Sequence, residues 1–149
     1  MRMRSGFFRT AALIVAAGFL SILASVSSAY ANVSVWIDIS TQTMSVSVNG
    51  WPYATWRVST ARSGYWTPRG SFRPFLLKRM HYSRKYDNSP MPHSIFFRGG
   101  YAIHGTGYVR YLGRPASHGC VRLAPGNAAR LYGLVRQYGL SDTRIVINY

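Results

Sequence analysis

Apolar and polar residues alternate over residues 33–40 and again over 44–49, and no other pattern constrains the fold of this chain as strongly. A period of two predicts strands that each bury one face. Asn49-Gly50 predicts a two-residue hairpin turn after the second strand, because both residue types tolerate a positive φ. With a third strand over residues 53–59, we expect the domain to begin as an antiparallel meander.

The rest of the chain predicts further strands and one helix. Pro125 suits the first turn of a helix and Gly139 suits its end, with apolar residues at helical spacing between them. Residues 81–94 contain two prolines and several charges, and we expect them to be irregular. Four more segments predict strands: residues 72–80, 95–97, 101–103 and 144–148. The expected fold class is mostly β (β-rich α+β), with one helix packed on the strands.

Residues 1–31 predict a cleavable secretory signal peptide. Three arginines precede an apolar run over residues 11–23, and residues 29–31 end in an Ala-x-Ala cleavage pattern. An uncleaved anchor is the alternative, but this run is shorter than the roughly 20 residues that span a membrane. We therefore expect residues 32–149 to form one domain that is exported to the periplasm or cell envelope.

The chain is strongly basic, with 18 Lys and Arg residues against 3 Asp and Glu residues. Such a charge predicts an anionic partner, which for an exported chain is an anionic envelope polymer or a lipid surface. The excess of basic residues could equally serve solubility alone, or be an adaptation to an acidic exterior. We expect no nucleic-acid partner, because the sequence has neither a basic helix nor an aromatic RNA-binding motif.

Cys120 is the only cysteine of the chain, so it cannot form a disulfide within it. It is either a passive buried residue or a thiol kept free for chemistry. His118 lies two residues before it and His104 lies upstream, and a thiol beside an imidazole makes a nucleophile near neutral pH. Neighbouring glycines, Gly105 and Gly119, leave amide groups free to face an oxyanion. This combination predicts cysteine acyl transfer.

A catalytic zinc site is the competing interpretation of the same residues, because His104, His118 and Cys120 could supply three ligands. However, the sequence has neither a Cys-x-x-Cys nor a His-Glu-x-x-His motif, and no acidic residue lies near to act as a base. We therefore expect neither a metal nor another cofactor.

Residues 104–106 (His-Gly-Thr) and 117–122 (Ser-His-Gly-Cys-Val-Arg) resemble the signature of the L,D-transpeptidase (YkuD-type) family of peptidoglycan enzymes. The opening hairpins, the 59–70 loop and residues 90–97 also resemble that family in order, so the similarity covers essentially all of residues 32–149. It implies a YkuD-like antiparallel β-sandwich, with its main helix packed near the strand of the catalytic cysteine.

The resemblance also implies roles for individual residues. Cys120 would be the nucleophile and His104 the general base and acid, with the Gly105 carbonyl orienting that imidazole in place of a carboxylate. The amides of Gly119 and Cys120 would form the oxyanion hole. Arg122 would bind a substrate carboxylate, for which the forked guanidinium is suited.

Other candidate residues have two interpretations each. His118 is either a second active-site imidazole that contacts the loop or substrate, or a structural histidine. Ser117 is more readily a turn-stabilising hydroxyl than a substrate contact. The loop histidines His81 and His93 are ligands or substrate contacts, or neither. We expect three further residues to line the acceptor side of the active-site cleft, only because of their position in the irregular segment: Tyr82, Met91 and Pro92.

The function that this resemblance implies is an exported peptidoglycan L,D-transpeptidase. It would acylate Cys120 with a tetrapeptide stem, release D-Ala, and pass the acyl group to an amine of another stem. The motif leaves the acceptor open: water would make a carboxypeptidase or amidase, and a protein lysine an anchoring or releasing enzyme. A sortase-like enzyme is disfavoured by the short His104–Cys120 gap, and a non-catalytic cationic envelope-binding protein is the alternative outside enzymes.

Overall fold

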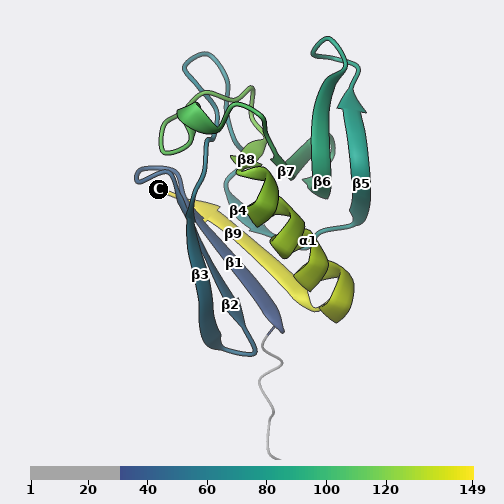
Figure 1. The fold of residues 1–149 in the computed structure, drawn as a ribbon. Helices are drawn as coiled ribbons and strands as arrows, with labels where there is room; N and C mark the ends of the chain where they lie inside the picture. The colour runs from purple at the N-terminus through teal and green to yellow at the C-terminus, as the bar shows by residue number, and fades with distance from the viewer. Residues whose placement is uncertain (1–30) are drawn as a thin grey trace, which may run out of the picture.

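The computed structural model describes residues 31–149, which form two β-sheets and one long helix (Figure 1). Residues 1–30 of the predicted signal peptide lie outside the described part. Within residues 31–149, no helix is both long and apolar enough to cross a membrane. The fold class expected from the sequence, a strand-rich sandwich with one main helix, is confirmed.

The first sheet contains the predicted meander. Its five strands lie in the order β3-β2-β1-β9-β4. Their bounds are β1 Val33–Asp38, β2 Thr43–Val48, β3 Trp51–Arg57, β4 Gly70–Phe72 and β9 Thr143–Asn148. Asn49 (φ 51°) and Gly50 (φ 81°) make the β2–β3 turn with the positive φ values that the sequence predicts. β9 inserts between β1 and β4 and runs parallel to β1.

The second sheet has the order β5-β6-β7-β8. Its strands are β5 Leu76–Ser83, β6 Ser89–Arg98, β7 Tyr101–Gly105 and β8 Val121–Leu123. The prediction of one strand over residues 72–80 was wrong, because β4 ends at Phe72 and β5 begins at Leu76 in the other sheet. Pro74 lies in this break, where its missing N–H and fixed φ interrupt strand pairing.

The prediction that residues 81–94 are irregular was also wrong. Most of this segment belongs to the β5–β6 hairpin, in which Tyr82 pairs with Pro90 and Met80 with Pro92. β7 pairs with β6 only from Ile95 onward, so both prolines lie where β6 has a neighbour on one side. Proline is tolerated at such a strand edge, because no ladder bond is lost on the open side.

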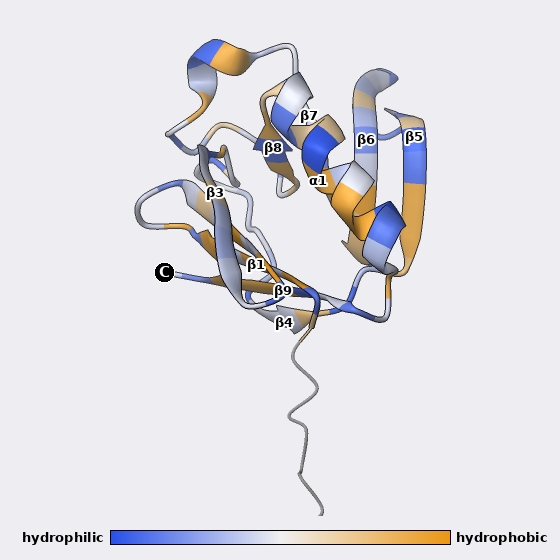
Figure 2. Ribbon diagram, turned by 60° about the horizontal axis from the view of Figure 1, so that its bottom comes forward, coloured by the Kyte–Doolittle hydropathy of each residue, from blue (hydrophilic) through white to orange (hydrophobic). Residues whose placement is uncertain are grey.

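The single α-helix, α1 Pro125–Tyr138, begins and ends where the sequence predicts. Pro125 is in its first turn, and Gly139 (φ 101°) caps its end. The helix packs against β6 and β7 (Figure 1), and its buried side chains join the main core between the sheets. Figure 2 shows hydrophobic residues concentrated in the inner strands β1 and β9, whereas the edge strand β3 has intermediate hydropathy.

Candidate active site

The strands β7 and β8 determine which side chains face the site. They pair in parallel, with Ile103 opposite Val121 and His104 opposite Arg122. Ile103 and Val121 are buried in the main core. Because successive side chains of a strand point to opposite faces, His104 and Arg122 lie on the other face of the sheet. Cys120 immediately precedes β8 and faces the same way, two residues before Arg122.

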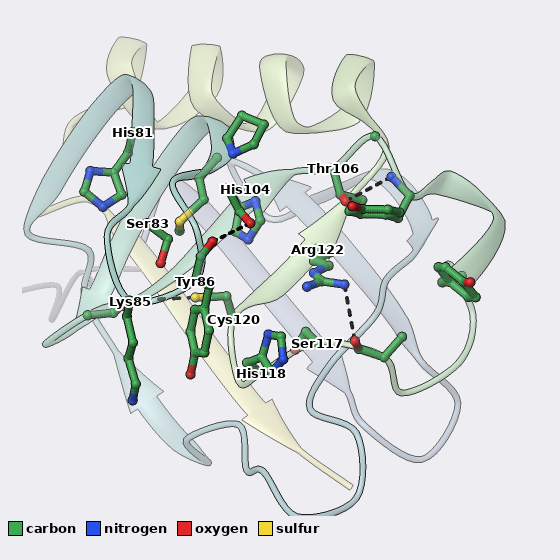
Figure 3. A pocket seen from close by; sticks show the side chains of 18 of the residues that line it. His81, Ser83, Lys85, Tyr86, His104, Thr106, Ser117, His118, Cys120 and Arg122 are labelled. Carbon is green, nitrogen blue, oxygen red and sulfur yellow. Dashed lines mark hydrogen bonds between the residues drawn. The ribbon is translucent and has the colours of Figure 1, made fainter.

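This face borders a cavity of about 1160 Å³ (Figure 3). The cavity is also lined by His81 from β5, which packs edge-on against Phe96 with ring centroids 5.2 Å apart. His93 does not line it and instead contacts Tyr132 of α1. Besides His81, seven of the residues singled out in the sequence line the cavity: Tyr82, Met91, His104, Ser117, His118, Cys120 and Arg122.

His104 is only 6% exposed, and its Nδ1 lies 2.7 Å from the carbonyl oxygen of Gly105. A carbonyl oxygen can only accept, so Nδ1 donates its proton and Nε2 carries the free lone pair. Burial, helped by the positive charge of Arg122, lowers the pKa of His104 to about 4 against the opposing effect of the Gly105 contact. The imidazole is therefore a neutral base at physiological pH.

Cys120 is partly buried against a small apolar cluster that contains Met91, Phe96 and Ala102. Burial raises the pKa of the Cys120 thiol, although the backbone of Ala102 and the charge of Arg122 act in the opposite direction. The thiol donates a long hydrogen bond of 3.8 Å to the Gly100 carbonyl. It therefore keeps its proton at neutral pH.

The turn before Cys120 is fixed by hydroxyl groups. The Gly119 N–H donates to Ser117 Oγ at 3.0 Å, so Ser117 stabilises this turn. The Gly119 carbonyl accepts from Thr67 Oγ1 at 2.8 Å, and Thr67 Oγ1 accepts the Ala61 N–H at 3.0 Å. The Gly119 N–H must break its hydrogen bond to Ser117 Oγ before it can donate to an oxyanion, so its role in the oxyanion hole stays a prediction. Nothing in the sequence indicated this role for Thr67 beyond its place in a predicted turn.

Substitution of Gly119 by alanine is expected to destabilise the protein by about 2–4 kcal/mol. Gly119 has φ 129°, and an added Cβ would lie 2.6 Å from Tyr101 Cε1 and 2.9 Å from the Trp66 carbonyl oxygen. Urea unfolding measures the change. Gly133→Ala in α1 is the matched control, where nothing lies within 4 Å and alanine is expected to stabilise by up to about 1 kcal/mol. Equal stabilities for the Gly119 variant and wild type would contradict this account.

His118 connects two loops at the cavity. Its ring stacks on Tyr86 of the β5–β6 turn, with centroids 4.3 Å apart and an interplanar angle of 11°. It also meets Tyr65 of the β3–β4 loop edge-on at 4.7 Å. Partial burial lowers the pKa of His118, and the charges of Arg62, Arg122 and Lys85 lower it further. The sequence did not identify Tyr65 or Tyr86, because contacts between separate loops leave no periodic pattern.

Zinc binding requires three ligands that converge on one point. Among residues 31–149, no group of three or more His, Cys, Asp or Glu side chains is placed to hold a metal ion. His104, His118 and Cys120, the three ligands of the zinc interpretation, therefore do not form such a group.

Solved L,D-transpeptidases share this fold. The enzyme from Mycobacterium smegmatis matches with a TM-score of 0.70 and 25% identity, over 79% of this chain and 59% of that one. The enzyme from Stackebrandtia nassauensis matches with a TM-score of 0.68 and 28% identity, over 79% of this chain and 56% of that one. LdtMt1 in complex with imipenem matches with a TM-score of 0.70 and 23% identity, over 78% of this chain and 59% of that one. The chain thus spans less than two thirds of each.

No curated protein sequence shows significant similarity to the chain. The family profile of the L,D-transpeptidase catalytic domain (YkuD) matches residues 32–147, which include both β-sheets and α1. Given this match over most of its length, the chain belongs to the YkuD family of L,D-transpeptidase catalytic domains.

Proposed function

We propose that the chain is an exported peptidoglycan L,D-transpeptidase that acts through a thioester on Cys120. The observation that carries the proposal is the placement of Cys120, His104 and Arg122 on one face of the second sheet, at a single cavity, in a domain of this family. The donor would be a tetrapeptide stem, cleaved between its third residue and the terminal D-Ala.

In the first half-reaction, Cys120 Sγ attacks the carbonyl carbon of the third residue while His104 Nε2 accepts the thiol proton. Collapse of the tetrahedral intermediate breaks the peptide bond, and His104 returns the proton to the amine of the departing D-Ala. The raised pKa of Cys120 and the lowered pKa of His104 disfavour an ion pair before substrate binds. Proton transfer therefore accompanies the attack.

In the second half-reaction, an amine attacks the thioester and His104 accepts its proton, which then reprotonates the sulfur. Arg122 would position a carboxylate of the stem. Its Nη1 donates to the Ala116 carbonyl at 3.3 Å, and this contact orients the guanidinium within the cavity. The backbone amide of Cys120, joined by Gly119 once its bond to Ser117 exchanges, would stabilise the oxyanion.

Export is supported by the sequence pattern of residues 1–31, with its arginines, apolar run and Ala-x-Ala site. The substrate lies outside the cytoplasmic membrane, so the proposed activity and the proposed location in the periplasm or cell envelope agree.

Incubation of the protein with a tetrapeptide stem and an excess of labelled D-amino acid tests the proposal. Mass spectrometry is expected to find free D-Ala and a stem that carries the label at its fourth position. A tripeptide as the only product would instead indicate the carboxypeptidase alternative. No D-Ala release, together with salt-sensitive binding to peptidoglycan, would favour the non-catalytic binding protein.

A further inference from the structure

The cavity is lined by cations from four separate segments. They are Arg62 of the β3–β4 loop, Arg84 and Lys85 of the β5–β6 turn, Arg114 of the β7–β8 connection, and Arg122 of β8. Arg62, Arg84, Lys85 and Arg114 are exposed, whereas Arg122 is partly buried. Positive charge therefore surrounds the site on several sides rather than following one strand or loop.

No carboxylate of the chain lines this cavity. The sequence contains only three acidic residues, Asp38, Asp87 and Asp142, and none of them is among the lining residues. Asp38 Oδ1 accepts hydrogen bonds from the backbone and hydroxyl of Ser40 at the end of β1. The cations of the cavity are thus not neutralised by a carboxylate on its wall.

Tyrosine rings take the place of counter-ions. A ring face attracts a cation electrostatically but does not accept the in-plane N–H groups of a guanidinium, which stay available for a carboxylate. The pairs at the cavity, with distances from the charged group to the ring centroid, are Arg62–Tyr65 at 5.0 Å, Lys85–Tyr86 at 5.5 Å, Arg114–Tyr111 at 4.8 Å and Arg122–Tyr108 at 6.0 Å.

Stacking of this kind also occurs elsewhere, as in Arg98 over Trp66 and Arg69 over Tyr149. Stacking alone therefore does not distinguish the cavity. What distinguishes it is convergence, because four stacked cations meet at one concave site that also holds Cys120. A ligand inside this site that bears several carboxylates can contact more than one of them at once.

We propose that the cavity selects stem peptides whose carboxyl groups are free over stems in which these groups are amidated, with Arg62 and Arg114 as specificity-determining residues. This inference rests on the proposed function, since it concerns the donor of the same reaction. Amidation leaves the shape of the stem almost unchanged but replaces each negative charge with a neutral carboxamide. The selection is therefore electrostatic rather than steric.

Two tetrapeptide stems that differ only in free carboxyl against carboxamide groups test the inference. At low salt, kcat/KM for D-Ala release is expected to be about tenfold or more higher for the free stem, as one or more charge-assisted contacts would give. The ratio is expected to fall toward one at 1 M salt, where the screening length is about 3 Å. Equal rates at low salt, or a preference for the amidated stem, would overturn the inference.

The double variant Arg62→Gln/Arg114→Gln assigns the effect to these residues. It is expected to lower kcat/KM for the free stem about tenfold and to bring the ratio of kcat/KM between the two stems closer to one. The matched control is Arg130→Gln, which removes an exposed arginine of α1 outside the cavity and is expected to leave the ratio unchanged. Equal slowing of both stems by the double variant would overturn the assignment.

Imipenem separates this inference from the proposed function. An imipenem adduct on the wild-type protein reports the activated thiol whichever stem is preferred. An adduct with equal turnover of both stems would overturn the selectivity alone, whereas no adduct and no D-Ala release would overturn the proposed function.

Discussion

Substitution of Cys120 by alanine is expected to abolish D-Ala release and imipenem adduct formation, and to change the free energy of unfolding by only about 1 kcal/mol. The side chain is the only thiol of the chain, so no other residue can form the thioester. It packs against the small cluster of Met91, Phe96 and Ala102 and makes one long hydrogen bond to the Gly100 carbonyl, so its truncation to alanine removes little. Intact-mass spectrometry and urea unfolding measure the two effects separately.

Alkylation of the wild-type thiol provides a control for this account. Because burial raises the pKa of Cys120, iodoacetamide is expected to label it slowly at pH 7 and faster as the pH rises beyond the range of an ordinary thiol. Labelling at pH 7 as fast as that of an unhindered cysteine would contradict the protonated thiol. An imipenem adduct on Cys120→Ala would contradict its role as the nucleophile.

Substitution of His104 by glutamine is expected to lower kcat/KM for D-Ala release by about 10²–10⁴-fold. Glutamine keeps a polar side chain of similar size, but it has no basic nitrogen for the thiol proton. Steady-state release assays measure the loss. His93→Gln is the matched control, since His93 does not line the cavity, and its activity is expected to stay near that of wild type.

The same substitution is expected to change how stability depends on pH. The pKa of His104 is about 4 in the folded protein and about 6.5 when unfolded, so below pH 6.5 the unfolded chain binds a proton that the folded chain does not. Folding is therefore destabilised as the pH falls from 6.5 to 4, by about 3 kcal/mol in all. His104→Gln removes this pH-dependent loss of stability. Urea unfolding at pH 7 and 4.5 should therefore show a smaller decrease in the free energy of unfolding for the variant than for wild type. An equal decrease in the free energy of unfolding for wild type and variant would contradict the low pKa of His104.

The elements that the sequence predicted correctly are those with local signals. The meander follows from alternation and from Asn49-Gly50, and α1 from Pro125, its apolar spacing and Gly139. The β5–β6 hairpin was missed because proline normally argues against a strand. Whether a proline is tolerated depends on whether a third strand lies beside it, and that is a property of the assembled sheet.

Local signals also decide which residues could be expected to lie together at the cavity. Cys120, His104 and Arg122 were predicted because they belong to two short motifs, and the parallel register of β7 and β8 brings these motifs together. Tyr86 and Arg114 were not predicted. Tyr86 reaches the cavity from the β5–β6 turn, which is distant from the motifs in sequence, and Arg114 lies in the connection between the two motifs; no periodicity or spacing indicates which loop residues will meet there.

The parallel pairing of β1 with β9 has a consequence for the order in which the protein matures. Val33 pairs with Thr143, so the interior of the first sheet joins segments from opposite ends of the domain. Such distant pairings form slowly, and this one must wait until β9 has been synthesised. Ile145 and Ile147 of β9 are part of the core on which β7 and β8 pack. Cys120 and His104 thus precede β9 in synthesis, and the core that supports their strands is complete only once β9 has joined β1.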